Sequence, residues 1–421
     1  MPAAPLVSAP PLQVTSETAA LRQVVVHTPG EEMGLVSPAN KDELLFDDIL
    51  FVEDARDEHE VFVRLFEATV GADDAVLQLA DLLREALADA DAREDYVETL
   101  VRLLPERNFE AYRDDLRALD PDALHRFALT GQAPFPISAH PLPNLLFTRD
   151  LSAVVGDHVL LSLAATGARR PESALIRTVF RHHPRFRSAR ERVIELPPDT
   201  TFEGGDLLVV SDRVVMIGHS ERTNLGGVMR VARELMDRTP VEHVLVVNLP
   251  QARYCMHLDT VFTFADDETC VVFPPIIEGG AHNVLHLEAG PERGSGGPAE
   301  FRARVLPGVR EALEETTGRR LAFVPCGGDD PIRQRREQWT DGANLFAIRP
   351  GLVVGYDRNR STYDALREYG FRTVDAEHFL ADGAAAARAT DERIAVRLCG
   401  NELSRGRGGP RCMTMPLVRA E

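Results

Sequence analysis

LLVVSDRVVMIGHSERTNLGGVMRVARELMDRTPVEHVLVVN, the segment at residues 207–248, contains two short apolar runs, a helical pattern and a third apolar run in succession. The runs at 207–210, 214–217 and 244–248 predict strands, whereas residues 227–238 have the apolar spacing of a helix. Further strand patterns occur at 21–26 and, alternating with helices, beyond residue 141. This alternation predicts an α/β fold.

One region departs from the alternation. In residues 73–133 apolar side chains recur at intervals of three and four, as at Val76, Leu79, Leu83 and Leu87, and β-branched runs are rare. We expect an inserted helical subdomain at 73–133, with residues 21–72 and 134–421 forming the catalytic domain. The chain begins with a proline- and alanine-rich stretch, and we expect residues 1–20 to be a disordered leader.

Composition narrows the class of protein. The 421 residues carry 47 basic and 66 acidic side chains, a formal net charge of −19, which argues against nucleic acid as a partner. No stretch reaches the ~20 apolar residues of a membrane helix, and the start lacks the features of a secretory signal. We therefore expect a cytoplasmic protein. The five cysteines are scattered and form no CxxC pair, so no metal site or disulfide framework is predicted.

Two candidate sites are acidic. Residues 144–150 (NLLFTRD) end in Arg149 and Asp150, which taken alone are most simply a structural ion pair. Residues 203–206 (EGGD) place two glycines between acids, and these allow a close backbone approach. The alternative for the second segment is a tight turn whose acids face solvent.

Two further candidates carry an imidazole and a thiol. In a strand at 256–262 (MHLDTVF), His257 and Asp259 would point to the same face, either as a functional pair or as a surface contact. Cys412 follows a glycine-rich basic loop, residues 405–411 (RGRGGPR), whose arginines would favour a thiolate. The alternative for Cys412 is a small buried apolar side chain.

Together these motifs resemble those of one family. FTRD (147–150), EGGD (203–206), SERT (220–223), MHLDTVF (256–262), EQWTDGAN (337–344) and GNELSRGRGGPRCMTMP (400–416), with LLFDDI (44–49), are similar to segments of bacterial arginine deiminase, a member of the guanidino-group-modifying superfamily. The resemblance spans residues 21–416. It implies a five-bladed, pseudo-symmetric α/β propeller of ββαβ units with an inserted helical subdomain and a central active site.

The resemblance also implies a mechanism. Asp150 and Asp259 would hold the guanidinium of L-arginine, and Cys412 would attack its central carbon. His257, oriented by Glu203, would protonate the leaving ammonia and then activate water against a covalent thiouronium. The product would be L-citrulline.

The resemblance implies further contacts to substrate and no cofactor. The expected substrate-binding residues are Asn144, Phe147, Arg169, Arg222 and Arg407, with Arg170 an alternative to Arg169. Arg407 is expected to act as a gate on its glycine-rich loop. We also expect a homo-oligomer. The alternatives are a deiminase or amidinotransferase for another guanidino compound and a non-catalytic arginine-binding regulator.

Overall fold

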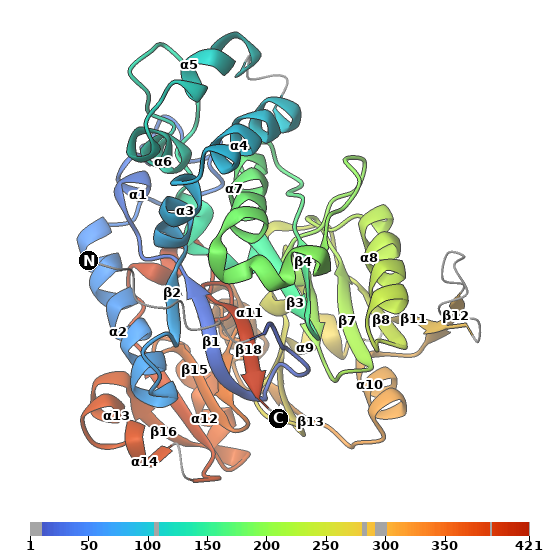
Figure 1. Ribbon diagram of the computed structural model, residues 1–421. Helices are drawn as coiled ribbons and strands as arrows, with labels where there is room; N and C mark the ends of the chain where they lie inside the picture. The colour runs from blue at the N-terminus through green and yellow to red at the C-terminus, as the bar shows by residue number, and fades with distance from the viewer. Residues whose placement is uncertain (1–10, 105–108, 280–283, 291–300, 388–389, 421) are drawn as a thin grey trace.

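Five separate sheets are formed by the strands of the residues that the computed structural model describes, 11–104, 109–279, 284–290, 301–387 and 390–420 (Figure 1). One sheet joins the two ends of the chain and contains β18 (Met415–Ala420), β1 (Ala20–Val26) and β2 (Val76–Gln78). The next contains β3 (Ser152–Val155), β4 (His158–Leu161) and β5 (Val193–Ile194). The mixed α/β class expected from the strand and helix patterns is confirmed.

The remaining three sheets follow along the chain. The largest has the order β12 (Phe301–Leu306), β11 (Val284–Ala289), β8 (His243–Asn248), β7 (Val214–His219) and β6 (Leu207–Val209). Another contains β13 (Ala322–Pro325), β10 (Thr269–Val272) and β9 (Phe262–Phe264). The last has the order β14 (Phe346–Arg349), β15 (Leu352–Tyr356), β17 (Ile394–Leu398) and β16 (Arg372–Asp375).

All five sheets share one pairing pattern. An edge strand pairs antiparallel with a second strand, which pairs parallel with a third. These sets of three are β18–β1–β2, β3–β4–β5, β6–β7–β8, β9–β10–β13 and β14–β15–β17. We call β18, β3, β6, β9 and β14 the leading strands.

Helices provide the parallel crossovers and the outer layers. Their bounds are α1 (Glu31–Gly34), α2 (Val52–Val70), α3 (Leu79–Leu87), α4 (Ala90–Leu103), α5 (Arg113–Arg117), α6 (Pro121–Thr130), α7 (Arg170–His182), α8 (Leu225–Arg238), α9 (Pro274–Ile277), α10 (Val309–Thr317), α11 (Pro331–Trp339), α12 (Arg360–Glu368), α13 (Ala376–Asp382) and α14 (Ala384–Ala387). None of the described helices is long and apolar enough to cross a membrane.

The local sequence explains helix α8 well. Asn224 caps its first turn by accepting a hydrogen bond from the Gly227 N–H. Val228, Val231 and Leu235 recur at helical spacing and are fully buried. The helix therefore starts where its cap lies and covers its sheet with its apolar stripe.

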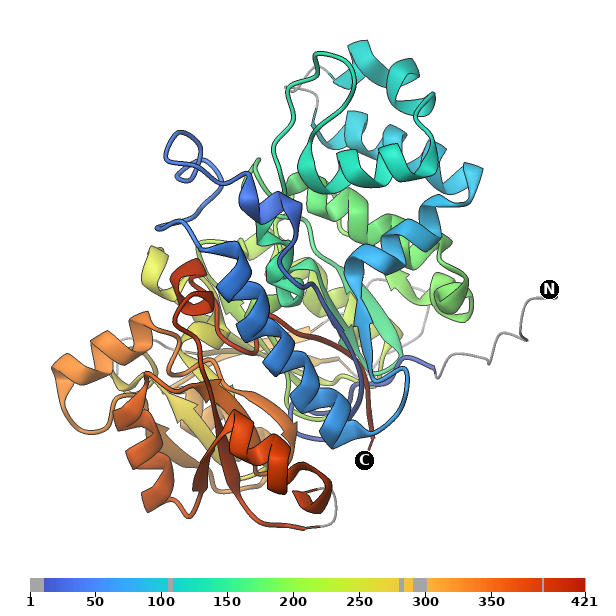
Figure 2. The ribbon, with the colours of Figure 1, turned by 90° about the vertical axis from the view of Figure 1, so that its left-hand side faces the viewer.

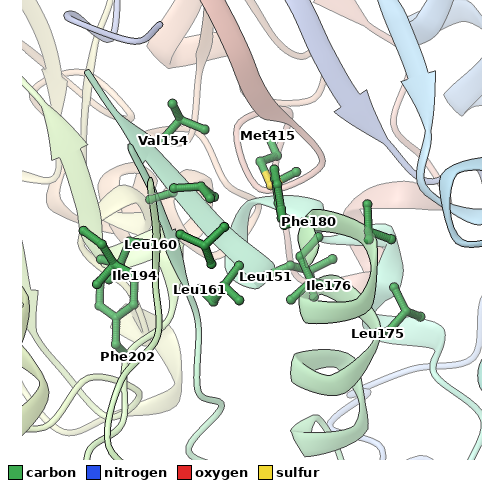
Figure 3. Close-up of a cluster of buried hydrophobic side chains, with 14 of the residues drawn as sticks. Leu151, Val154, Leu160, Leu161, Leu175, Ile176, Phe180, Ile194, Phe202 and Met415 are labelled. Carbon is green, nitrogen blue, oxygen red and sulfur yellow. The ribbon is translucent and has the colours of Figure 1, made fainter. Parts of the chain in front are cut away.

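Helix α7 covers the β3–β4–β5 sheet in the same way. Figure 3 shows Ile176 and Phe180 from this helix near Leu161 of β4 and Met415 of β18. All four side chains are buried and belong to one apolar cluster. Helix α7 also contacts the turn at Thr148–Leu151 that precedes β3.

Helices α3 to α6 gather at one end of the molecule, beside α7 (Figures 1 and 2). Their buried side chains, Tyr96 and Leu100 among them, share an apolar cluster with Phe180 of α7. Residues 76–78 lie in the region expected to be helical but form strand β2, because they pair in parallel with β1.

The disorder expected for residues 1–20 is wrong for the part that the structure describes. Residues 1–10 lie outside the described residues. Beyond them, Gln13 pairs with Val418 and Val14 pairs with Gly156, and Glu17 is buried in an ion pair with Arg411. Backbone pairing and a buried charge hold this segment, neither of which a proline- and alanine-rich composition reveals.

Candidate active site

The turns before the leading strands carry the candidate catalytic side chains. Asp150 lies just before β3, Glu203 before β6, Asp259 before β9, Asn344 before β14 and Cys412 before β18. Each of these residues is buried. The repeated position at the start of a sheet brings together groups that are far apart in the sequence.

Two glycines allow the EGGD turn to come close to its neighbours. A Cβ on Gly204 would lie 2.2 Å from the carbonyl oxygen of Arg149, and one on Gly205 would lie 2.8 Å from Oδ1 of Asp150. No larger residue fits at either position without movement of the backbone or the carboxylate. Because Glu203 and Asp206 are buried, the alternative of a turn with solvent-facing acids is wrong.

His257 lies between two carboxylates. Its Nε2–H donates to Oε2 of Glu203 at 2.8 Å, and its Nδ1 lies 3.6 Å from Oδ1 of Asp150. The strand expected over residues 256–262 begins only at Phe262, and residues 258–260 form a 3-10 turn. His257 and Asp259 therefore do not share the face of a strand, and both are buried instead of forming a surface contact.

The carboxylates around His257 favour its charged form. Burial lowers the pKa of the imidazole, but Asp150, Glu203 and Asp206 together raise it to about 9. Burial raises the pKa of Glu203, while its hydrogen bond with His257 and the charge of Arg169 lower it to about 2. At neutral pH the pair is an imidazolium and a carboxylate.

Asp150 pairs with Arg169. The guanidinium donates from Nη1 to Oδ2 of Asp150 at 2.6 Å and from Nε to Oε2 of Glu172 at 2.9 Å. The simple interpretation of Asp150 as an ion pair with its neighbour Arg149 is wrong, because Arg149 donates from Nε to a backbone carbonyl at 3.3 Å. The Oδ1 atom of Asp150 is buried and has no hydrogen-bond partner.

Cys412 faces the second carboxylate. Its Sγ lies 3.8 Å from Oδ2 and 4.0 Å from Oδ1 of Asp259, and Oδ2 accepts a hydrogen bond from Nη1 of Arg411 at 2.8 Å. Burial and the charges of Asp259, Asp150 and Asp341 raise the pKa of the Cys412 thiol well above its usual value. The expectation that neighbouring arginines favour a thiolate is thus wrong for the substrate-free site, where carboxylates dominate around the sulfur.

A narrow cavity opens onto these groups. It is lined by Leu45, Asn144, Phe147, Asp150, Arg169, Arg222, Arg253, Met256, His257, Thr260, Gly406, Arg407 and Cys412. Glu203 and Asp259 contact it through His257 and Cys412. The structure therefore brings all ten candidate site residues to one place.

The cationic side chains on this cavity differ in their bonding. Arg222 is buried, and its Nε and Nη1 have no hydrogen-bond partner. Arg169 is fully engaged by Asp150, Glu172 and the Asn144 carbonyl. Arg170, the alternative to Arg169, does not line the cavity. Arg222 therefore has donors left for an anionic group, although its Nε lies 3.6 Å from Oε1 of Glu221, and Nε of Arg407 is likewise buried without a hydrogen-bond partner.

The remaining substrate-binding candidates form the walls and the cover. The Asn144 amide donates to the Leu44 carbonyl at 2.8 Å, and Phe147 packs against the glycine loop, where a Cβ on Gly408 would meet its ring at 2.3 Å. Arg407 has a left-handed backbone, φ 66°, and its guanidinium carbon lies 3.6 Å from the centre of the Trp339 ring. Its Nη1 donates to the Trp339 carbonyl. Arg407 therefore lines the cavity in contact with Trp339.

Sequence reasoning missed several groups around the site. Four of these residues lie inside the motifs that carry the resemblance: Asp206, Asp341, Asn344 and Arg411. Their position in the same motifs as Glu203, Trp339 or Cys412 is the feature of the sequence that could have pointed to them. Burial raises the pKa of Asp206 and of Asp341 to about 7. Glu17 had no signal in the sequence.

One group of side chains in the described part of the chain has the spacing of a metal site. The ligand atoms of Asp150, Glu203 and His257 lie within 4.8 Å of one another. Arg169 Nη1 already bonds Asp150 and lies 3.5 Å from Glu203 Oε2, and the imidazole is protonated at neutral pH. A guanidinium and an imidazolium thus already supply the positive charge, which favours an ionic network here.

Comparison with known proteins decides the family. The family model described as arginine deiminase matches residues 42–111 and 108–419. An arginine deiminase of Listeria welshimeri is 36% identical over 97% of this chain and 98% of its own length. The chain belongs to the arginine deiminase family. Another arginine deiminase, from Bacillus cereus, is 34% identical over 98% of this chain and 99% of its own length.

More distant structures share the fold of this arginine deiminase family member. SxtG, an amidinotransferase of the saxitoxin pathway from Microseira wollei, matches 98% of this chain and 98% of its own with a TM-score of 0.57 at 15% identity. AgrE, solved with ornithine and NAD+, matches 94% of this chain with a TM-score of 0.50 at 14% identity, and the match spans 40% of its length. At these identities the likeness concerns the fold alone.

Proposed function

We propose that this protein hydrolyses L-arginine to L-citrulline and ammonia through a covalent adduct on Cys412. Membership of the arginine deiminase family supports the reaction. The observation that carries the assignment of roles is the facing pair of carboxylates, Asp150 and Asp259, with Cys412 Sγ 3.8 Å from one and His257 3.6 Å from the other.

The substrate guanidinium would lie between the two carboxylates. Each carboxylate has one oxygen fixed by a protein arginine, Asp150 by Arg169 and Asp259 by Arg411. The other oxygen of each has no arginine partner and could accept N–H donors from the substrate in charge-assisted hydrogen bonds. The unpaired donors of buried Arg222 would bind the α-carboxylate, with Asn144 and Arg169 nearby and Phe147 along the aliphatic stem.

Substrate binding would also activate the nucleophile. The thiol of the free enzyme is held protonated by burial and three carboxylates. A guanidinium cation between Asp150 and Asp259 would neutralise their effect, so the thiol would lose its proton to solvent water, because His257 is already protonated. The thiolate then attacks the guanidinium carbon and forms a tetrahedral adduct.

His257 would serve in both halves of the reaction. Since its Nε2 is bonded to Glu203, Nδ1 faces the substrate and donates a proton to the departing amine. Ammonia leaves, and a thiouronium remains on Cys412. The neutral imidazole then takes a proton from water, hydroxide adds to the same carbon, and collapse expels the thiolate. Citrulline forms, and the excess proton goes to ammonia.

The five sheets support the finer proposal of a five-bladed propeller. Each has the same antiparallel and then parallel pairing, and each leading strand begins beside the site. We propose residues 73–133 as the inserted helical subdomain, with the flanking segments 21–72 and 134–421 as the catalytic domain. A cytoplasmic location agrees with the need of Cys412 for a reducing compartment. The homo-oligomer stays a prediction that light scattering of the purified protein would test.

Two alternative functions would involve the same site. A deiminase or amidinotransferase for another guanidino compound would employ the same cysteine, but a transferase must admit an amine acceptor in place of water. A non-catalytic arginine-binding regulator would bind arginine without turnover. Cys412, His257 and Asp150 line one cavity, and Asp259 lies directly behind Cys412, an arrangement that favours a catalyst.

Product analysis on purified protein tests the proposal. Incubation with arginine alone should release citrulline and ammonia in equal amounts, and acid quenching during turnover should add the mass of the thiouronium to the Cys412 peptide. Cys412→Ala should fold and lose turnover by orders of magnitude. Amidino transfer that requires added glycine or lysine, or substantial activity in Cys412→Ala, would exclude the proposed reaction.

A further inference from the structure

Glu17 and Arg411 form a buried ion pair directly behind the carboxylate of Asp259. Arg411 donates from Nε to Oε2 and from Nη2 to Oε1 of Glu17, both at 3.0 Å. Its remaining terminal nitrogen, Nη1, donates to Oδ2 of Asp259 at 2.8 Å. One guanidinium therefore links an acid of the N-terminal segment to the carboxylate that faces Cys412.

We infer that Glu17 is a positioning residue of the active site, which through Arg411 holds Asp259 in place and balances the positive charge behind it. This inference rests on the proposed deimination, because it concerns the carboxylate that would hold the substrate. None of the described residues 11–20 lines the cavity, so Glu17 acts only through Arg411.

The backbone around Glu17 supports this role. The Glu17 N–H donates to the Val209 carbonyl at 2.8 Å, and the Val209 N–H donates back to Glu17 Oε1 at 3.0 Å. The segment is thus fixed to strand β6, and the carboxylate points at Arg411 in a bidentate geometry. Such a geometry fixes the orientation of both partners.

The charges explain why an acid is needed at this place. A buried arginine without Glu17 would place an uncompensated positive charge against Asp259. That charge would bind Asp259 more strongly, repel the substrate guanidinium and stabilise a thiolate on Cys412. With Glu17 ionised, the pair is close to neutral, and the charge of Asp259 stays available to the substrate.

The other charged groups of the neighbourhood have different partners. Glu17 also interacts with the charges of Arg149 and Arg419, and Arg149 interacts with the charge of Asp259 as well. The Cys412 thiol faces Asp150 and Asp341 besides Asp259, and Asp259 faces His257. Among the hydrogen bonds between described side chains, Arg411 alone connects Glu17 with Asp259.

Two variants of Glu17 test the inference. Glu17→Gln keeps the size and removes the charge, so the KM for arginine should rise about tenfold. In the substrate-free enzyme, alkylation of Cys412 by iodoacetamide, followed on its peptide by mass, should shift to lower pH by about one unit. Glu17→Asp keeps the charge and should restore the alkylation profile of the wild type.

The controls separate a positioning role from a structural one. Glu32→Gln removes a buried carboxylate that bonds His27, and should leave both the KM and the alkylation profile unchanged. A folded Glu17→Gln with unchanged KM and unchanged alkylation profile would overturn the inference, even if its melting temperature fell. If Glu17→Gln does not fold, Arg411→Lys replaces it. A lysine cannot bond both acids as Arg411 does, and an unchanged KM there would equally overturn the inference.

The alkylation readout does not depend on turnover. Wild-type protein that makes no citrulline would contradict the proposed function, whereas the shift between Glu17→Gln and wild type would still be measurable. The two failures are therefore distinguishable.

Discussion

The Asn344 side chain links the backbones of the candidate nucleophile and of one substrate-binding carboxylate. The Cys412 N–H donates to Oδ1 of Asn344 at 3.1 Å, and the Asn344 amide donates from Nδ2 to the Asp259 carbonyl at 3.0 Å. Asn344 is fully buried and precedes the leading strand β14. Three of the five sheets are thereby joined at the site by one amide.

Truncation of this amide should misplace the nucleophile. We expect Asn344→Ala to lower kcat/KM for arginine by about 100-fold, because a displacement near 1 Å costs about that much in an oriented reaction. Steady-state kinetics with circular dichroism check this outcome. Gln23→Ala is the matched control. Gln23, in strand β1, is also a buried amide, and it donates a hydrogen bond to the backbone carbonyl of Asp74. Equal kinetic losses in both variants would remove the special role of Asn344.

The thiol of Cys412 should titrate at high pH in the free enzyme. Alkylation should be slow at neutral pH and accelerate as the solution becomes alkaline, because burial and neighbouring carboxylates raise the pKa of Cys412. Asp259→Asn removes a negative charge beside Sγ and should move the profile to lower pH. Asp266→Asn, at a buried acid that pairs with Arg393, should leave it in place. Rapid alkylation of the wild type at pH 6 would contradict this account.

Arg222 should make the protein prefer substrates that carry an α-carboxylate over those that lack one. Arg222→Ala should raise the KM for arginine about 100-fold, since a buried charge pair to a carboxylate is lost. Agmatine lacks that carboxylate, so its binding should change far less. Arg230→Ala removes an exposed arginine of α8 and should affect neither compound. The same loss for arginine and agmatine would exclude the assignment.

Asp206 should make the stability of the protein fall as pH rises. Its pKa is about 7 in the folded protein because of burial, and near 3.8 without it. The folded state therefore holds an extra proton between these values, and the stabilisation present below pH 4 is lost as pH rises towards 7. Asp206→Asn cannot ionise. The difference in melting temperature between Asp206→Asn and wild type should grow by several degrees in favour of the variant from pH 4 to pH 8. If this difference is the same at both pH values, Asp206 ionises in the folded protein without loss of stability, and the prediction is wrong.

Much of the fold was readable locally. The apolar runs at 207–210, 214–217 and 244–248 became β6, β7 and β8, and the spacing at 227–238 became α8. The short strands β2 and β5 gave no comparable signal, because strands of three and two residues are held by pairing with a neighbour. Their existence depends on segments that are distant in the sequence.

The candidate site, like the fold, was only partly predictable from the sequence. Cys412, His257, Glu203, Asp150 and Asp259 were all named from their motifs, and the structure gathers them around one cavity. Apart from the pair of His257 and Glu203, which the resemblance implies, the partners of these residues cannot be named from the sequence. Asp150 pairs with Arg169, not with adjacent Arg149, because the approach of α7 and not sequence order sets which guanidinium is in reach.

The chemical groups, most of the strand and helix segments and the family motifs can be read from the order of residues, because each depends on neighbours along the chain. The electrostatic state of the site follows from the folded structure alone. Glu17 and Arg411 are 394 positions apart, yet they share a buried ion pair, and the protonated thiol of Cys412 depends on carboxylates from three other segments. The pKa of a buried group depends on the burial and on the charges of all residues packed around it. These residues come from distant parts of the chain, so their combined effect cannot be read from the order of the residues.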